Sequence, residues 1–74
     1  MSEGAYQVIL FDSVNSALLA EKLLKRDGIS FKIIPVPRHL SSDCGVCIRI
    51  PSHELQRAEH VLSRGVRIQG IHAL

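Results

Sequence analysis

Two segments of the chain end a helix in the same way, and this internal repeat restricts the fold more than any other feature. Residues 20–29 read AEKLLKRDGI and residues 58–66 read AEHVLSRGV, and the two segments align after one gap. Each contains the end of a helix, then a glycine that stops it, then the first apolar residue of a strand. The sequence therefore predicts two similar halves, each with a helix followed by a strand.

The first half begins with the apolar run YQVILF at residues 6–11, which predicts a buried strand. Asp12 or Ser13 can cap the helix that follows, because a short oxygen-bearing side chain accepts a hydrogen bond from a free N–H of the first turn. This helix is expected from residue 14 to about residue 26. Gly28 ends it, because glycine adopts the left-handed C-cap conformation without a clash at Cβ.

Residues 29–36 predict a second strand, and two prolines mark it as an edge strand. Pro35 and Pro37 have no N–H to donate to a neighbouring strand, so this segment is tolerated only at the side of a sheet. The remaining expected elements are a strand over residues 44–51, a helix capped by Ser52 and stopped by Gly65, and a strand over residues 66–74.

The predicted order of elements is strand, helix, strand, strand, helix, strand. Two interleaved βαβ units of this length form one four-stranded antiparallel sheet, in the spatial order 4-1-3-2, with both helices on one face. We therefore expect an α+β, ferredoxin-like fold with residues 1–74 as a single domain and Tyr6, Phe11 and Phe31 in its core. The alternative is a βαβ pair that completes its sheet by exchanging strands in a dimer. This fold supports many activities, so the function has to be argued from particular residues.

The composition excludes several functional classes. With 46% hydrophobic and 22% charged residues, it is typical of a soluble globular protein. No apolar run approaches the roughly 20 residues needed to span a bilayer, and the N-terminus holds an acid where a secretory signal has basic residues. The net charge of +2 is spread along the chain, and the segment GVCIRI lacks the aromatic residues on which RNA bases stack. We expect a cytoplasmic protein that binds neither membrane nor nucleic acid.

The two cysteines, Cys44 and Cys47, form a C-x-x-C motif that can be interpreted in four ways. The first is a dithiol redox pair, which lies at a helix N-terminus in thioredoxin-type proteins; this motif instead enters a strand, where positions three apart face opposite sides. The second is a metal site. Zinc needs four ligands, usually from two such motifs, and only His39 lies near this one. We therefore predict no metal and no cofactor.

The third interpretation is a single working thiol at Cys44, and the fourth is a pair of inert core thiols. Cys44 lies where a polar loop enters a strand, beside Gly45, whose missing side chain lets a substrate approach closely. The cations Arg38 and His39 favour a thiolate, and Asp43 opposes it. Spacing alone does not separate these two interpretations. The candidate binding residues around Cys44 are Arg38, Ser41, Ser42, Asp43 and Gly45.

Strand parity divides the third strand into two faces. Cys47 and Arg49 lie on one face, and Ile48 and Ile50 lie on the other. We expect the open face of the sheet to carry Cys47, Arg49 and Gln69. Because prolines protect the second strand, any homodimer is expected to form through the fourth strand or through this open face.

Two motifs give the chain a family resemblance. The first is A-E-K-x-L-K-x-x-G at residues 20–28, and the second is I-P-x-P-R-x-[LI]-[ST]-S-x-C-G at residues 34–45. With these motifs the chain resembles the bacterial family called "Putative Se/S carrier protein-like". The cysteine of the second motif matches Cys44, whereas Cys47 falls where a small apolar residue is expected. The resemblance therefore implies one working cysteine and one bystander.

The resemblance implies a carrier protein more than a turnover enzyme. Cys44 is expected to hold sulfane sulfur or selenium and to pass it from a donor protein to an acceptor protein by thiolate attack. The competing hypothesis is a non-enzymatic small-ligand sensor or protein-interaction module, in which Cys44 is merely a small residue. A persulfide donor distinguishes the two, because only a carrier gains sulfur mass on Cys44.

Overall fold

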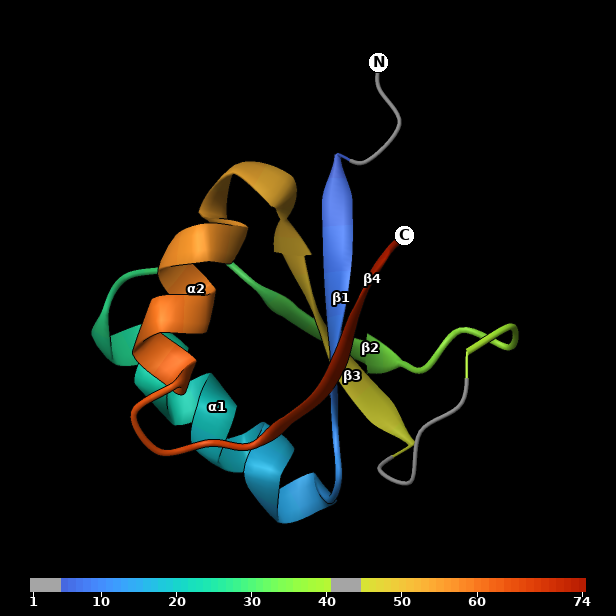
Figure 1. Cartoon of the computed structure of the whole chain (residues 1–74), viewed down its shortest axis with the longest axis horizontal. Coiled ribbons are helices and arrows are strands. Elements are labelled where there is room, and N and C mark those ends of the chain that lie inside the picture. The colour runs from blue at the N-terminus through green and yellow to red at the C-terminus, as the bar shows by residue number, and fades with distance from the viewer. Residues whose placement is uncertain (1–4, 41–44) are drawn as a thin grey trace.

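A four-stranded antiparallel sheet carries two helices on one face (Figure 1). The computed structural model describes residues 5–40 and 45–74. The strand order is β2-β3-β1-β4, which confirms the predicted α+β, ferredoxin-like arrangement. Neither helix within these residues is long and apolar enough to cross a membrane. The elements are β1 (Tyr6–Phe11), α1 (Val14–Arg26), β2 (Lys32–Pro35), β3 (Val46–Pro51), a short 3-10 turn (Ser52–Glu54), α2 (Leu55–Leu62) and β4 (Ile68–Ala73).

β1 lies in the middle of the sheet and pairs with β3 on one side and β4 on the other. Leu10 of β1 is opposite Cys47 in β3 and opposite Gly70 in β4. β2 pairs only with β3, so the edge position that its prolines predict is confirmed. Gln69 lies beside a register shift between β1 and β4 and is exposed.

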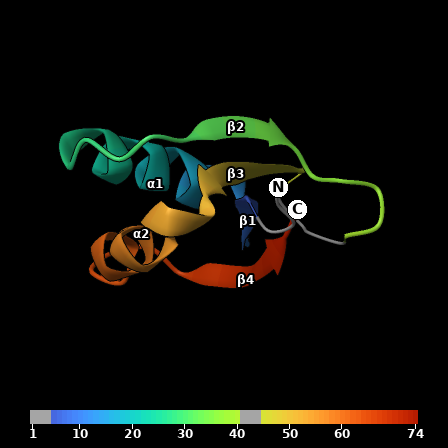
Figure 2. The same ribbon diagram turned by 90° about the horizontal axis from the view of Figure 1, so that it is seen from above.

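The main core lies between the sheet and the helices (Figure 2). The helices contribute several alanines to this layer, and small side chains let a helix pack closely on a sheet. Phe11 is fully buried as predicted, and Phe31 is partly buried against the same core. Tyr6 does not belong to the core, because it is 40% exposed. The buried residues of this cluster are Ile9, Phe11, Ala17, Ala20, Leu24, Ile29, Ile48, Ile50, Ala58, Val61 and Leu62.

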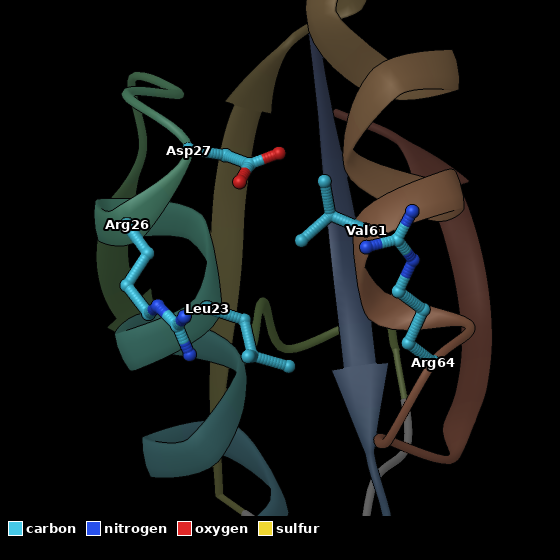
Figure 3. Close-up of a pocket in the computed structure, with 5 residues that line it drawn as sticks. All are labelled: Leu23, Arg26, Asp27, Val61 and Arg64. Carbon is cyan, nitrogen blue, oxygen red and sulfur yellow. The ribbon is translucent and has the colours of Figure 1, made fainter.

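The two helices run antiparallel and leave a hollow between them (Figure 3). The hollow has a volume of about 280 Å³ and is lined by Leu23, Arg26, Asp27, Val61 and Arg64. Its apolar residues belong to the helix surfaces, and its charged residues lie at the helix ends. We name it the inter-helix hollow.

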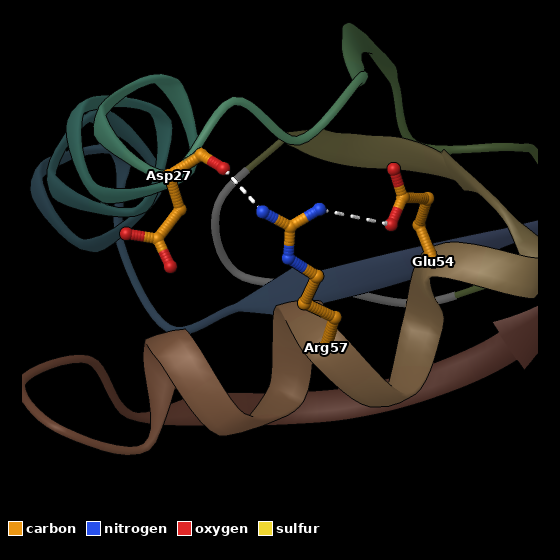
Figure 4. Close-up of polar contacts among 3 residues, drawn as sticks. All are labelled: Asp27, Glu54 and Arg57. Atoms are coloured by element: carbon orange, nitrogen blue, oxygen red, sulfur yellow. Dashed lines mark hydrogen bonds and ion pairs between the residues drawn. The ribbon is translucent and has the colours of Figure 1, made fainter.

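Arg57 of α2 connects the second helix to the end of the first (Figure 4). Its Nη2 donates a hydrogen bond of 2.6 Å to the carbonyl oxygen of Asp27, the C-cap residue of α1. Its Nη1 also lies 3.6 Å from the carboxylate of Glu54. Carbonyl groups at the end of a helix lack an intrahelical donor, so this arginine satisfies one of them.

The helix boundaries agree with the sequence at the first helix and differ at the second. Ser13 caps α1 by accepting a hydrogen bond of 3.2 Å from the N–H of Ser16, and Gly28 follows its end with φ +70°. A 3-10 turn separates Ser52 from α2, whose N-cap is Glu54 and has no side-chain capping bond. Ser52 instead accepts a hydrogen bond from Gln7 at 3.4 Å. The prediction that Ser52 caps this helix is therefore wrong.

The two glycines that follow the helices give a matched test of backbone conformation. Alanine at Gly28 should lower the free energy of unfolding by about 1–2 kcal/mol, because the position has positive φ. Alanine at Gly65 should leave stability unchanged or raise it by up to about 1 kcal/mol, since its φ is not positive. Neither added Cβ meets an atom within 4 Å, so crowding does not contribute. Urea unfolding of both variants measures the difference, and equal effects would contradict it.

Candidate functional site

The predicted site lies on the loop between β2 and β3. This loop leaves the sheet on the side opposite the helices (Figure 2). Since β3 runs antiparallel to β1 and begins beside its end, the loop lies at the end of the sheet where β1 turns into α1. The helix layer therefore does not cover it.

Two backbone hydrogen bonds shape the described part of the loop. The N–H of Val36 donates to the carbonyl oxygen of Gly45 at 3.2 Å and closes the base of the loop. The N–H of Leu40 donates to the carbonyl oxygen of Pro37 at 2.9 Å, which makes a tight turn. Arg38 and the next residue, His39, lie within this turn, and both are exposed to solvent. The loop thus presents its cationic side chains to solvent on a constrained backbone.

A second apolar cluster anchors the same loop to the sheet. Val8, Leu10 and Cys47 are buried on the face away from the helices, and Val36 and Leu40 from the loop pack against them. Ile34 of β2 completes this set. We name it the outer cluster. Because both residues that flank the Pro37–His39 segment are held by apolar contacts, this part of the loop is fixed to the sheet at two points.

Cys47 belongs to the interior of the protein. Its side chain is 0% exposed, and its thiol donates to the carbonyl oxygen of Pro35 with an Sγ···O distance of 3.9 Å. Strand parity is correct, since Cys47 faces away from Ile48 and the helices. The prediction that Cys47 lies on an open face is wrong, because Val36 and Leu40 cover it. A thiol in this position cannot meet a ligand or a partner until the loop moves.

Gly45 is needed for its backbone conformation. Its φ is +85°, a region that other residues adopt only with strain, and a Cβ built there meets no atom within 4 Å. The positive φ is thus a reason for glycine at this point that does not depend on the approach of a substrate. The left-handed residue turns the chain into β3, which begins at Val46.

The structure describes two of the predicted site residues, Arg38 and Gly45, which lie on the two arms of the loop. The predictions for Ser41, Ser42, Asp43 and Cys44 concern positions outside the described residues. Within residues 5–40 and 45–74, no three His, Cys, Asp or Glu side chains group together as potential metal ligands.

The outer cluster was not expected from the sequence, although a signal for it exists. The segment VILF has no alternation of apolar and polar residues. A continuous apolar run is typical of a strand buried on both faces, and so indicates that something covers the second face. The apolar Val36 and Leu40 in an otherwise polar loop are the residues that supply this cover.

A comparison with protein-family models finds a match over residues 6–73 to a family described as "Putative Se/S carrier protein-like". The match extends from the first residue of β1 to the last residue of β4. No curated protein and no solved structure matches the chain.

The burial of Cys47 predicts the reactivity of its thiol. In a Cys44→Ser background, where Cys47 is the remaining cysteine, we expect Ellman's reagent to react at least about 100-fold more slowly in native buffer than in guanidinium chloride, because access requires local opening. Leu40→Ala should accelerate the native reaction by removing part of the cover. Leu18→Ala is the control, since Leu18 is 51% exposed on α1. Fast labelling of the Cys44→Ser protein in native buffer would contradict the burial of Cys47.

Proposed function

Because the chain belongs to the Se/S carrier protein-like family, we propose that it holds sulfane sulfur or selenium on Cys44 and passes it between partner proteins. The observation that carries the choice of residue is the burial of Cys47 in the outer cluster. The chain has two cysteines, and a carrier needs a thiol that a partner can reach. Because the thiol of Cys47 is buried, we assign the carrier role to Cys44.

The proposed chemistry is two successive exchanges at one sulfur atom. The Cys44 thiolate attacks the outer sulfur of a donor persulfide, forms a new S–S bond, and releases the donor cysteine as a thiolate. A thiolate of the acceptor protein then attacks the outer sulfur on Cys44 and regenerates the Cys44 thiolate. Each step exchanges one thiolate for another, so no cofactor and no net oxidant is needed. Selenium in the outer position follows the same scheme.

The loop architecture supports this role. A carrier cysteine needs a backbone that holds it out for a partner and polar groups that stabilise an anionic sulfur. The arm of the loop that follows β2 is anchored by Val36 and Leu40, and Arg38 lies on the turn between these two residues. We assign to Arg38 the stabilisation of the anion. Ser41, Ser42, Asp43 and Gly45 complete the proposed binding loop.

The setting of the reaction follows from its chemistry. Thiolate exchange requires a compartment that keeps thiols reduced, so we place the carrier in the cytoplasm. The partners are a donor and an acceptor protein, each with a cysteine or its selenium equivalent. β4 is the edge strand without prolines, so we assign to it any pairing between two copies of the chain.

Intact-mass measurement after incubation with a persulfide donor tests the carrier directly. Wild type and Cys47→Ala should each gain the mass of one sulfur atom, and Cys44→Ser should gain none, because a hydroxyl does not hold sulfane sulfur. Cys47→Ala should keep its fold, with a loss in stability of about 1 kcal/mol. Circular dichroism checks the fold of all three proteins.

The same mass measurement distinguishes the carrier from a dithiol protein and from a ligand sensor. Loss of loading in Cys47→Ala as complete as in Cys44→Ser would show a dithiol mechanism. A wild-type protein that never loads, with sulfur or with a selenium donor, would replace the carrier by the small-ligand sensor.

The role of Arg38 has its own test. In a Cys47→Ala background, Arg38→Ala should slow the reaction of Cys44 with iodoacetamide by about two- to tenfold near neutral pH, because loss of a neighbouring cation raises the pKa of a thiol. The difference in rate should vanish at high pH, where Cys44 is a thiolate in both proteins. Arg64→Ala, in the inter-helix hollow, is the matched control and should react like its parent. Equal rates for both arginine variants would remove Arg38 from the site.

A further inference from the structure

The outer face of the sheet carries two cationic side chains on neighbouring strands. Lys32 of β2 and Arg49 of β3 lie on this face, since their strand neighbours Ile34 and Cys47 belong to the outer cluster. None of the ion pairs formed among residues 5–40 and 45–74 includes either of them. The side-chain carboxylates in this part of the chain belong to helical segments or to residues close to their ends, namely Asp12, Glu21, Asp27, Glu54 and Glu59.

Lys32 and Arg49 are also direct cross-strand partners in the register of β2 and β3. Side chains in such a pair lie close together on the same face, and like charges there are destabilising. An anion bound between the two side chains would offset this repulsion. Two adjacent cations are the arrangement expected of an anion-binding site. Without a bound anion, their repulsion destabilises the sheet.

A hollow of about 200 Å³ lies at this pair. Its lining residues are Tyr6, Ser30, Phe31, Lys32, Arg49 and Pro51. The guanidinium carbon of Arg49 is 4.4 Å from the centroid of the Tyr6 ring, a cation–π contact that holds the guanidinium at the ring. This contact leaves the N–H groups at the edge of the guanidinium for a planar acceptor, and a carboxylate accepts two of them at once.

The remaining lining residues indicate which other groups the ligand has. Lys32 supplies a second positive charge, and the hydroxyl of Ser30 can donate a hydrogen bond. Phe31 and Pro51 contribute apolar surface beside these polar groups. The combination suits a single carboxylate attached to an apolar or aromatic group.

We propose that the hollow lined by Tyr6, Lys32 and Arg49 is a carboxylate-binding site. The carboxylate belongs either to a small organic acid or to a protein that presents a carboxyl group. The site lies toward the Pro51 end of β3, whereas the Cys44 loop enters β3 at Val46. It therefore does not depend on the proposed sulfur chemistry.

The inter-helix hollow provides an internal comparison. It also holds two arginines, Arg26 and Arg64, but the side chain of Asp27 lines it as well (Figure 3). Three of its lining residues, Leu23, Arg26 and Asp27, lie at the C-terminal end of α1, where the exposed carbonyl groups carry partial negative charge. Its cations are thus already compensated, and we expect no anion to bind there.

NMR titration of the full chain with benzoate tests the site. Amide shifts should change saturably at residues 6, 30–32, 49 and 50 and stay constant around Arg26 and Arg64. Arg49→Gln and Lys32→Gln should each weaken binding by about tenfold or more, because each removes a charge-assisted hydrogen bond. Arg26→Gln, the matched control in the inter-helix hollow, should change it less than about twofold. Lys32 is exposed, so its variant keeps the test valid if Arg49→Gln fails to fold.

Further ligands define the chemistry and the source. Benzamide should not bind, since it lacks the charge. A short peptide with a free C-terminal carboxylate, compared with benzoate, shows whether a protein or a small acid is the better source, and saturation by either supports the site. Binding of inorganic phosphate or an RNA oligonucleotide at the same residues with equal or higher affinity would overturn the carboxylate assignment. Unsaturable shifts, or variants that bind like wild type, would overturn the site itself.

Discussion

The burial of β1 on both of its faces is the constraint on which the rest of the structure depends. Four consecutive residues of this strand, Val8 to Phe11, are buried. Adjacent residues of a strand face opposite sides, so the strand needs apolar cover on each side. The helices cover one side and the β2–β3 loop covers part of the other. Since burying one such side chain is worth about 1.5–3 kcal/mol, the loop contributes to stability as well as presenting the candidate site.

Because the loop both covers the sheet and carries the candidate site, its positions are of two kinds. Val36 and Leu40 belong to the outer cluster, so changes there act on packing first and on the proposed sulfur chemistry only through the shape of the loop. Arg38 has no place in that cluster, so changes there act mainly on charge. The same cover encloses Cys47. Packing of the loop on the sheet thus gives the two cysteines of a C-x-x-C motif different roles in the proposal.

Most of the fold could be predicted from the sequence, because local signals and the repeat agree. The strand at 6–11, the helix at 14–26 with Ser13 and Gly28 at its ends, and the edge position of β2 follow from periodicity, capping and proline chemistry. The predictions for Ser52 and Tyr6 are wrong, because their environments depend on tertiary contacts with Gln7 and Arg49. The candidate site could be predicted as a list of residues. Cover of Cys47 by Val36 and Leu40 depends on how the loop folds back on the sheet, which the spacing of the cysteines does not encode.

The edge position of β2 has a dynamic consequence. β2 pairs with β3 alone and over four residues, whereas β1 has a paired neighbour on each side. Local opening begins where the fewest hydrogen bonds and the least apolar area must be separated. β2 and residues 36–40 therefore form the unit that can detach while the other three strands and both helices stay folded. For the proposed carrier, release of this edge strand would let residues 36–40 reach farther toward a partner than they can while β2 stays paired with β3.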